Sequence, residues 1–261
     1  MKSNIKYLMI MLSVLTLQTF AQSPESSNKN KIYMKNKKVL IVVTSFGEVK
    51  NGTKTGLWAE EFTTPYYIFN EKGIKVTIAS PKGGKTPLDP KSITGDYATA
   101  SVKKFLNDPD AQKFLNNTVT LESVQAEDYD AIFYPGGHGP MWDLPENKIS
   151  ISLIGSFYDD GKPVALVCHA PAALKNVKTK DGGYLISGKT VSGFTNSEEN
   201  AGQSVDMTPF LLEDMLIERG AKYEKGADWA PFAVQDGLLI TGQNPASAEL
   251  VAEKIIASLS K

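Results

Sequence analysis

Cys168 is the only cysteine of this 261-residue chain, and His169 follows it directly. The pair closes the apolar run VALV, so we expect the thiol where a buried strand turns into a helix. A turn of that kind lifts a nucleophile out of a sheet, and the helix N-terminus is expected to lower the thiol pKa. A buried structural cysteine is the alternative to a reactive cysteine, and the position directly after a strand favours the reactive cysteine.

Two pairs of acidic residues could assist the thiol and the imidazole. Glu198 and Glu199, in the segment GFTNSEE, could orient His169, because a base held by a third residue is the general logic of catalytic triads. Glu60 and Glu61 open the helix after the first long loop. If one of them faces inward, burial raises its pKa and it can hold or pass a proton. For both pairs the alternative is a solvated first turn of a helix, where acids are favoured anyway.

The segment YPGGHGP is expected to border the same pocket. Gly136 and Gly137 could aim backbone N–H groups at a developing negative charge, whereas a plain turn is the alternative. We expect His138 and Trp58 to line the pocket. No metal site is expected, because the two histidines and the cysteine match no zinc-ligand spacing, and no glycine-rich phosphate loop indicates a nucleotide.

Strands and helices alternate along the chain, which predicts an α/β fold with a doubly wound, mostly parallel sheet and helices on both faces. In such sheets, sites form beyond the carboxyl ends of the strands. The predicted strands are 38–46, 74–80, 130–137, 162–168 and 189–194, followed by a hairpin over 232–242. The predicted helices are 60–73, 101–115, a helix around 149–157, one beginning at 170, then 208–220 and 247–259.

The N-terminus resembles a secretory signal peptide over residues 1–21. Lys2 and Lys6 precede the apolar stretch 7–17, and Ala21 is the expected last residue before cleavage. An uncleaved membrane anchor is the alternative, but the stretch is shorter than the roughly 20 residues of a spanning helix. A flexible leader over 22–36 and one folded domain over 37–261 are predicted. We therefore expect an exported protein, periplasmic or secreted, with no stable membrane insertion after cleavage.

Charge composition limits the partners. The formal net charge is −1, with 28 basic and 29 acidic residues, so nothing in the sequence attracts nucleic acid. Arg219 is the one arginine, which argues against a bidentate clamp on phosphates or carboxylates. Small, weakly charged substrates are expected.

Several ordered motifs together resemble the ThiJ/PfpI superfamily, with its class I glutamine amidotransferase-like fold. They are TGLWAEEFTTPYYIF, VTIASPKGGKTPLDPKS, DYDAIFYPGGHGPMWDL, VCHAPAAL, SGFTNSEE and LITGQNPASA. The branch of glutathione-independent glyoxalases (glyoxalase III, D-lactate dehydratase) and related stress chaperones looks most similar. The match runs from about residue 37 to the C-terminus.

The resemblance implies a flavodoxin-like sheet, a homodimer and catalysis without an external cofactor. It implies a nucleophile at Cys168, its partner at His169, a carboxylate at Glu61, and Glu199 in preference to Glu198 as the third triad member. By analogy, the thiol attacks the aldehyde of methylglyoxal. His169 or Glu61 then moves a proton between the adjacent carbons through an enediolate, and water releases D-lactate.

Ala170 departs from the family pattern, which often has glycine there, so a methyl group could crowd the turn or narrow the pocket. The other functions considered are a deglycase, a holdase chaperone using an exposed apolar patch, a cysteine peptidase or amidotransferase, and a redox sensor based on sulfenic acid. The amidotransferase is disfavoured because similar folds place a histidine far downstream of the cysteine, and none follows His169.

Overall fold

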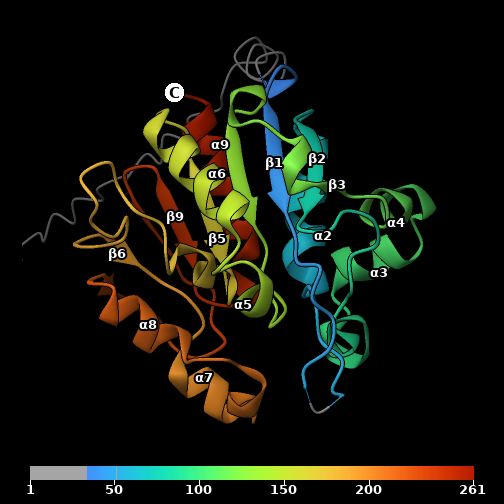
Figure 1. The fold of residues 1–261 in the computed structure, drawn as a ribbon. Helices are drawn as coiled ribbons and strands as arrows, with labels where there is room; N and C mark the ends of the chain where they lie inside the picture. Colours follow the sequence, from blue (N-terminus) through green and yellow to red (C-terminus); the bar gives the residue numbers. More distant parts are fainter. Residues whose placement is uncertain (1–33, 51) are drawn as a thin grey trace, which may run out of the picture.

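The computed structural model describes residues 34–50 and 52–261, and a seven-stranded sheet forms the centre of this part (Figure 1). The strand order is β3-β2-β1-β4-β5-β9-β8. Neighbouring strands are parallel except for β8 and β9. The strands are β1 Lys38–Val42, β2 Lys75–Ser80, β3 Val119–Thr120, β4 Ala131–Tyr134, β5 Val164–Val167, β8 Ala233–Asp236 and β9 Leu239–Gly242. This arrangement confirms the predicted doubly wound, mostly parallel sheet.

Continuous apolar runs form the middle of the sheet, because a parallel strand covered on both faces needs apolar side chains in both directions. Every residue of β4, β5 and β9 is buried. β5 lies between β4 and β9, so the strand that leads into Cys168 is paired on both edges and fully buried. A rigid strand at this position fixes the residue that follows it.

Helices cover both faces of the sheet. α2 (Ala59–Glu71) and α9 (Ala248–Leu259) contact one another on one face, while α6 (Lys148–Asp159) packs on β4 and β5 from the other (Figure 1). The other α-helices are α3 Ala100–Leu106, α4 Pro109–Leu115, α5 Pro140–Asp143, α7 Asn196–Ala201 and α8 Leu212–Glu218. The pair α3 and α4 lies at one side of the molecule, and α7 and α8 lie at the opposite side (Figure 1).

Two predicted helices differ from those observed. The segment 101–115 forms two helices, because the Asp108 side chain accepts from the Ala111 N–H and Pro109 begins the second helix. The predicted helix after Cys168 is a five-residue 3-10 helix, Ala170–Leu174. A short 3-10 turn has little of the dipole expected of a full α-helix.

The predicted strand over 189–194 is wrong in extent and place. Only β6 (Thr190–Val191) is extended, and it pairs with β7 (Lys222–Tyr223) in a separate two-stranded sheet. A hydrogen bond from the Ser192 N–H to Thr241 Oγ1, 2.8 Å, holds the following segment beside β9. The segment GFTNSEE therefore reaches the site without following a strand of the main sheet.

The predicted signal peptide, residues 1–21, lies outside the described residues, as does most of the predicted leader. Met34, inside the predicted leader, is 5% exposed and packs in the hydrophobic core. The packed part of the chain thus begins at least three residues before the predicted boundary. Across residues 34–50 and 52–261, no helix has the length and apolar character needed to span a bilayer.

Gly242→Ala is expected to destabilise the sheet where it contacts α9. A Cβ at this position would lie 2.7 Å from Val251 Cγ2 and 3.0 Å from both Ser247 Cβ and Val167 Cγ2. Overpacking of this kind costs about 1–3 kcal/mol. Gly155→Ala in α6, where a Cβ meets nothing within 4 Å, is the control and should stabilise by up to about 1 kcal/mol. Urea denaturation measures both, and equal midpoints for the two variants would contradict the expectation.

Candidate active site

Cys168 adopts a left-handed backbone conformation at the end of β5, with φ of +59°. This conformation is costly for a residue with a side chain, so the surroundings must enforce it. The Cys168 N–H donates to Gly242 O at 3.0 Å, and the Cys168 carbonyl accepts from the Phe194 N–H at 2.9 Å. The strand-to-helix turn predicted for the nucleophile is present, held on both sides by backbone hydrogen bonds.

The thiol, an imidazole and a carboxylate form a hydrogen-bonded chain. Cys168 Sγ lies 3.3 Å from His169 Nδ1, and His169 Nε2 lies 2.7 Å from Glu199 Oε2. Because an ionised carboxylate only accepts, the proton of the neutral ring is on Nε2, and Nδ1 is free to accept the thiol proton. The thiol–imidazole contact agrees with the partner role that the family resemblance implies for His169.

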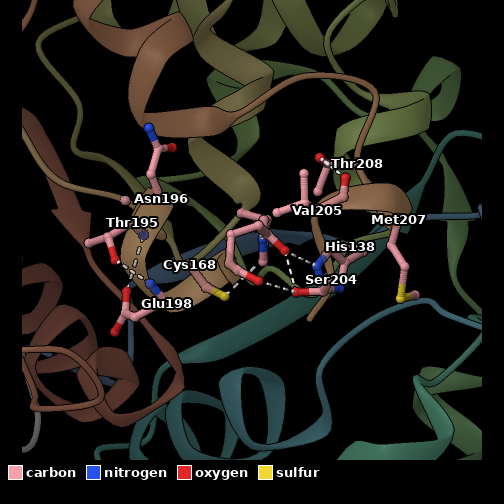
Figure 2. Close-up of polar contacts among 12 residues, drawn as sticks. His138, Cys168, Thr195, Asn196, Glu198, Ser204, Val205, Met207 and Thr208 are labelled. Carbon is pink, nitrogen blue, oxygen red and sulfur yellow. Dashed lines mark hydrogen bonds and ion pairs between the residues drawn. The ribbon is translucent and has the colours of Figure 1, made fainter. Parts of the chain in front are cut away.

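Glu199 also binds the second histidine of the chain. Its Oε1 accepts from His138 Nε2 at 2.9 Å and from Ser204 Oγ at 2.5 Å. His138 comes from the segment after β4, whereas Ser204 follows Glu199 by five residues, and Figure 2 draws the polar contacts of both side chains. The His169 ring lies between the rings of His138 and Phe194, with centroid distances of 4.1 and 4.3 Å. The imidazole next to the thiol therefore has little freedom to rotate.

Burial and charge keep His169 neutral and Glu199 ionised. Burial lowers the pKa of His169, and the neighbouring His138 lowers it further, against the opposing effect of Glu199. Burial by itself raises the pKa of Glu199, but the two histidines outweigh it and hold that pKa well below its usual range. A neutral imidazole oriented by a carboxylate is the form that can act as a general base.

Glu61 faces inward, as expected for one member of the Glu60–Glu61 pair. It is fully buried, and its Oε2 accepts from the Gly136 N–H at 2.7 Å. Its Oε1 is buried and has no oxygen or nitrogen partner among the described residues. Burial raises the pKa of Glu61 to about 8, against smaller lowering effects of the Gly136 N–H and the Cys168 thiol. The carboxyl group is therefore protonated at neutral pH and can donate to a bound oxygen.

The thiol pKa moves in the direction opposite to the prediction. Burial raises the pKa of Cys168 well above its usual range, the charge of Glu61 raises it further, and the Gly137 N–H opposes them. The helix that was expected to lower it is only a 3-10 turn. At rest the sulfur carries its proton, which His169 Nδ1 can take when an electrophile arrives.

Glu198 has a different function from Glu199, although the residues alone left both open as the orienting group. Glu198 is fully buried and closes the capping box of α7 with Thr195. Its Oε1 accepts from the Trp229 N–H and from the side-chain amides of Gln243 and Asn244, at 2.8, 3.1 and 2.8 Å. Glu198 thus connects three segments around the site, while Glu199 contacts the imidazole.

The two adjacent glycines allow close backbone approach. A Cβ on Gly136 would lie 2.9 Å from Glu61 Oε2, and one on Gly137 would lie 2.4 Å from Gly56 O. Gly137 also has a φ of +89°, which favours glycine. The prediction that Gly136 supplies an oxyanion donor is wrong, because its N–H is bound to Glu61.

A cavity of about 510 Å³ opens above Cys168 and His169. His138 and Trp58 line it, as predicted, and the buried Trp58 Nε1 has no hydrogen-bond partner among the described residues. Further residues that line the cavity were not predicted, and they are Tyr97, Phe194, Ser204, Met207 and Trp229. Phe194 and Ser204 flank the segment that contains Glu199 and could have been suspected from it, but no local signal marked Tyr97 or Trp229.

Comparison with known proteins identifies the family. A model described as the DJ-1/PfpI family matches residues 53–258. The chain belongs to the DJ-1/PfpI family. Glyoxalase 3 of Candida albicans is 32% identical over 85% of this chain and 98% of the relative. Glutathione-independent glyoxalase HSP31 of Saccharomyces cerevisiae is 35% identical over 85% of this chain and 98% of the relative.

Two solved structures align with most of this chain. The crystal structure of glyoxalase III from Candida albicans aligns with a TM-score of 0.79 and 31% identity, over 85% of this chain and 97% of that one. Rapid Encystment Protein 24 KDa of Francisella tularensis aligns with a TM-score of 0.81 and 41% identity, over 85% and 99% of the two chains. The resemblance inferred from the sequence motifs is confirmed.

Ala170, the departure from the family motif, does not disturb the turn. It is fully buried, its φ is not in the left-handed region, and it does not line the cavity. The expected crowding of the pocket by its methyl group is therefore not observed.

Glu61→Gln is expected to remove a loss of stability that develops as the pH rises from about 4.5 to about 8. The pKa of Glu61 is about 8 in the folded protein against an ordinary 4.5, so the folded state binds this proton more tightly than the unfolded state. The wild type therefore loses stability as the pH rises through this window, by on the order of 4 kcal/mol, since one pKa unit is worth about 1.4 kcal/mol. Glutamine does not titrate, so the variant should lack this loss.

Urea denaturation between about pH 5 and about pH 9 measures the difference. Glu253→Gln, at an exposed position of α9, is the matched control. A constant difference in unfolding free energy between wild type and Glu61→Gln over this range would contradict the assignment of a buried, protonated carboxyl.

Proposed function

We propose that this protein is a glutathione-independent glyoxalase that converts methylglyoxal, or a related 2-oxoaldehyde, to the corresponding 2-hydroxy acid. The observation that carries the proposal is the arrangement around Cys168 Sγ. A neutral base, His169 Nδ1, lies 3.3 Å away, and a buried carboxyl with a pKa of about 8 contacts the thiol. The similarity to relatives named as glutathione-independent glyoxalases supports the same activity.

The first step is addition of the thiol to the aldehyde carbon. Sγ forms the C–S bond, His169 Nδ1 takes the thiol proton, and the Glu61 carboxyl protonates the aldehyde oxygen. The product is a hemithioacetal, with a positive imidazolium and a negative Glu61 carboxylate. Glu199 stabilises the imidazolium through the 2.7 Å bond to Nε2.

Proton transfer between the two carbons follows. The Glu61 carboxylate removes the proton of the former aldehyde carbon and leaves an enediolate. It returns that proton to the adjacent carbon, while the hydroxyl proton moves to the other oxygen, and a 2-hydroxy thioester results. Water then attacks the thioester, Glu61 takes the water proton, and the imidazolium returns a proton to the departing sulfur. The sum is addition of one water to the oxoaldehyde, and no external cofactor takes part.

D-lactate is the product expected from methylglyoxal. The full chain incubated with methylglyoxal, without glutathione, should form D-lactate, and Cys168→Ala should lower kcat/KM by about a thousandfold or more. Glu61→Gln should lower it by about a hundredfold, with Glu253→Gln as the unaffected surface control. A stereospecific lactate assay is the measurement. Equal D-lactate formation by wild type and Cys168→Ala would show that the thiol is not the nucleophile.

We further propose that the chain is exported and loses residues 1–21. The support is the pair Lys2 and Lys6 before the apolar stretch 7–17, with Ala21 before the expected cleavage point. N-terminal sequencing of the protein recovered from its native cells should begin at Gln22. Recovery of the chain with its original N-terminus would refute cleavage.

A further inference from the structure

Both histidines of the chain, His138 and His169, bind the carboxylate of Glu199. The three residues are far apart in the sequence, since Glu199 lies 61 positions after His138 and 30 positions after His169. His138 comes from the segment after β4, His169 from the turn after β5, and Glu199 from α7. One ligand atom from each residue lies within 4.8 Å of the others. We call these three residues the two-histidine cluster.

We propose that the two-histidine cluster is a binding site for a divalent transition-metal ion of the Zn²⁺ class. The sequence predicted no metal site, because the histidines and the cysteine have no zinc-ligand spacing. The folded chain nevertheless assembles two imidazole nitrogens and one carboxylate, a ligand set that occurs in zinc enzymes and leaves a position open. Imidazole ligands favour Zn²⁺ and the neighbouring first-row transition-metal ions over Mg²⁺ and Ca²⁺, which prefer oxygen ligands.

The distances are compatible with the ion. Zinc binds imidazole nitrogen and carboxylate oxygen at about 2.0–2.2 Å, so ligand atoms in a tetrahedral site lie about 3.3 Å apart. The nitrogen-to-oxygen distances in the cluster are 2.9 Å for His138 and 2.7 Å for His169. The two nitrogen-to-oxygen distances, one to each oxygen of Glu199, must each increase by about half an ångström, and the ion replaces the two N–H protons that now point at Glu199.

The surroundings provide support and access. Ser204 Oγ donates to Glu199 Oε1 at 2.5 Å and can hold the carboxylate while it binds an ion, as outer partners of metal ligands do. His138, His169 and Ser204 all line the cavity, so an ion can enter and a water can take the fourth position.

Occupation of the cluster would switch off the base, an inference that rests on the proposed function. A neutral imidazole bound to an ion through Nε2 carries its remaining proton on Nδ1. His169 Nδ1 is the atom 3.3 Å from Cys168 Sγ. It would then donate to the sulfur and could no longer accept the thiol proton. The ion would therefore inhibit thiol addition reversibly.

Metal binding itself can be tested without any activity, in the Cys168→Ala variant of the full chain. This variant removes the thiol, which is the other zinc ligand nearby. After chelator treatment, the variant should bind one equivalent of Co²⁺ and show the visible absorption of tetrahedral Co²⁺ without a thiolate-to-metal band. Added Zn²⁺ should displace the Co²⁺. Zn²⁺ should also raise the melting temperature of the variant.

The controls use the same Cys168→Ala background. His138→Asn should weaken binding by at least about tenfold, the loss that even outer partners cause, whereas Glu60→Gln, at a cavity residue outside the cluster, should bind as tightly as its parent. No Co²⁺ spectrum in the parent variant, or equal affinity after His138→Asn, would overturn the metal site.

Inhibition by the ion is tested separately in the wild type. Zn²⁺ inhibition that EDTA reverses supports the inference that the ion switches off the base, and undiminished turnover with a saturated site would overturn that inference. Absence of methylglyoxal turnover would refute the proposed function but leave the Co²⁺ result intact.

Discussion

The left-handed backbone at Cys168 is the constraint on which the rest of the site depends. Without it, β5 would continue in its own direction and the thiol would stay among the apolar side chains of the sheet. The hydrogen bonds to Gly242 O and from the Phe194 N–H hold this conformation from both sides. Both come from segments that the sheet positions, so local strain is maintained by long-range structure. The turn places the sulfur below Glu61 and directs the next side chain toward Glu199.

Buried charge is distributed so that each group carries the charge its chemistry needs. Glu199 stays ionised because three donors, from His138, His169 and Ser204, replace the water it loses. Around Glu61, burial outweighs the lowering effects of the Gly136 N–H and the Cys168 thiol, so the carboxyl keeps its proton. Two carboxylates in one small site thus have pKa values pushed in opposite directions, and this separates an orienting anion from a proton donor.

Much of the fold followed from the sequence pattern. Apolar runs such as 39–42 and 164–167 predicted the central strands, because a parallel strand covered on both faces needs apolar side chains throughout. The hairpin over 232–242 was also predicted, and β8 and β9 form it as an antiparallel pair. The break in 101–115 was missed although Asp108 and Pro109 mark it. The placement of 189–194 was missed because a short extended run does not indicate which sheet it joins.

The sequence by itself determined the fold class and the family, and it singled out Cys168 and His169 because they follow a predictable strand end. The residues alone left Glu60 and Glu61 both open, and only the family resemblance favoured Glu61. Tertiary structure decided which glutamate contacts the imidazole, that the Gly136 N–H binds Glu61, and that both histidines meet on one carboxylate. It also decided the sign of the thiol pKa shift. These properties depend on burial and on distances between segments far apart in the chain. Neither burial nor such a distance can be derived from local composition or residue spacing.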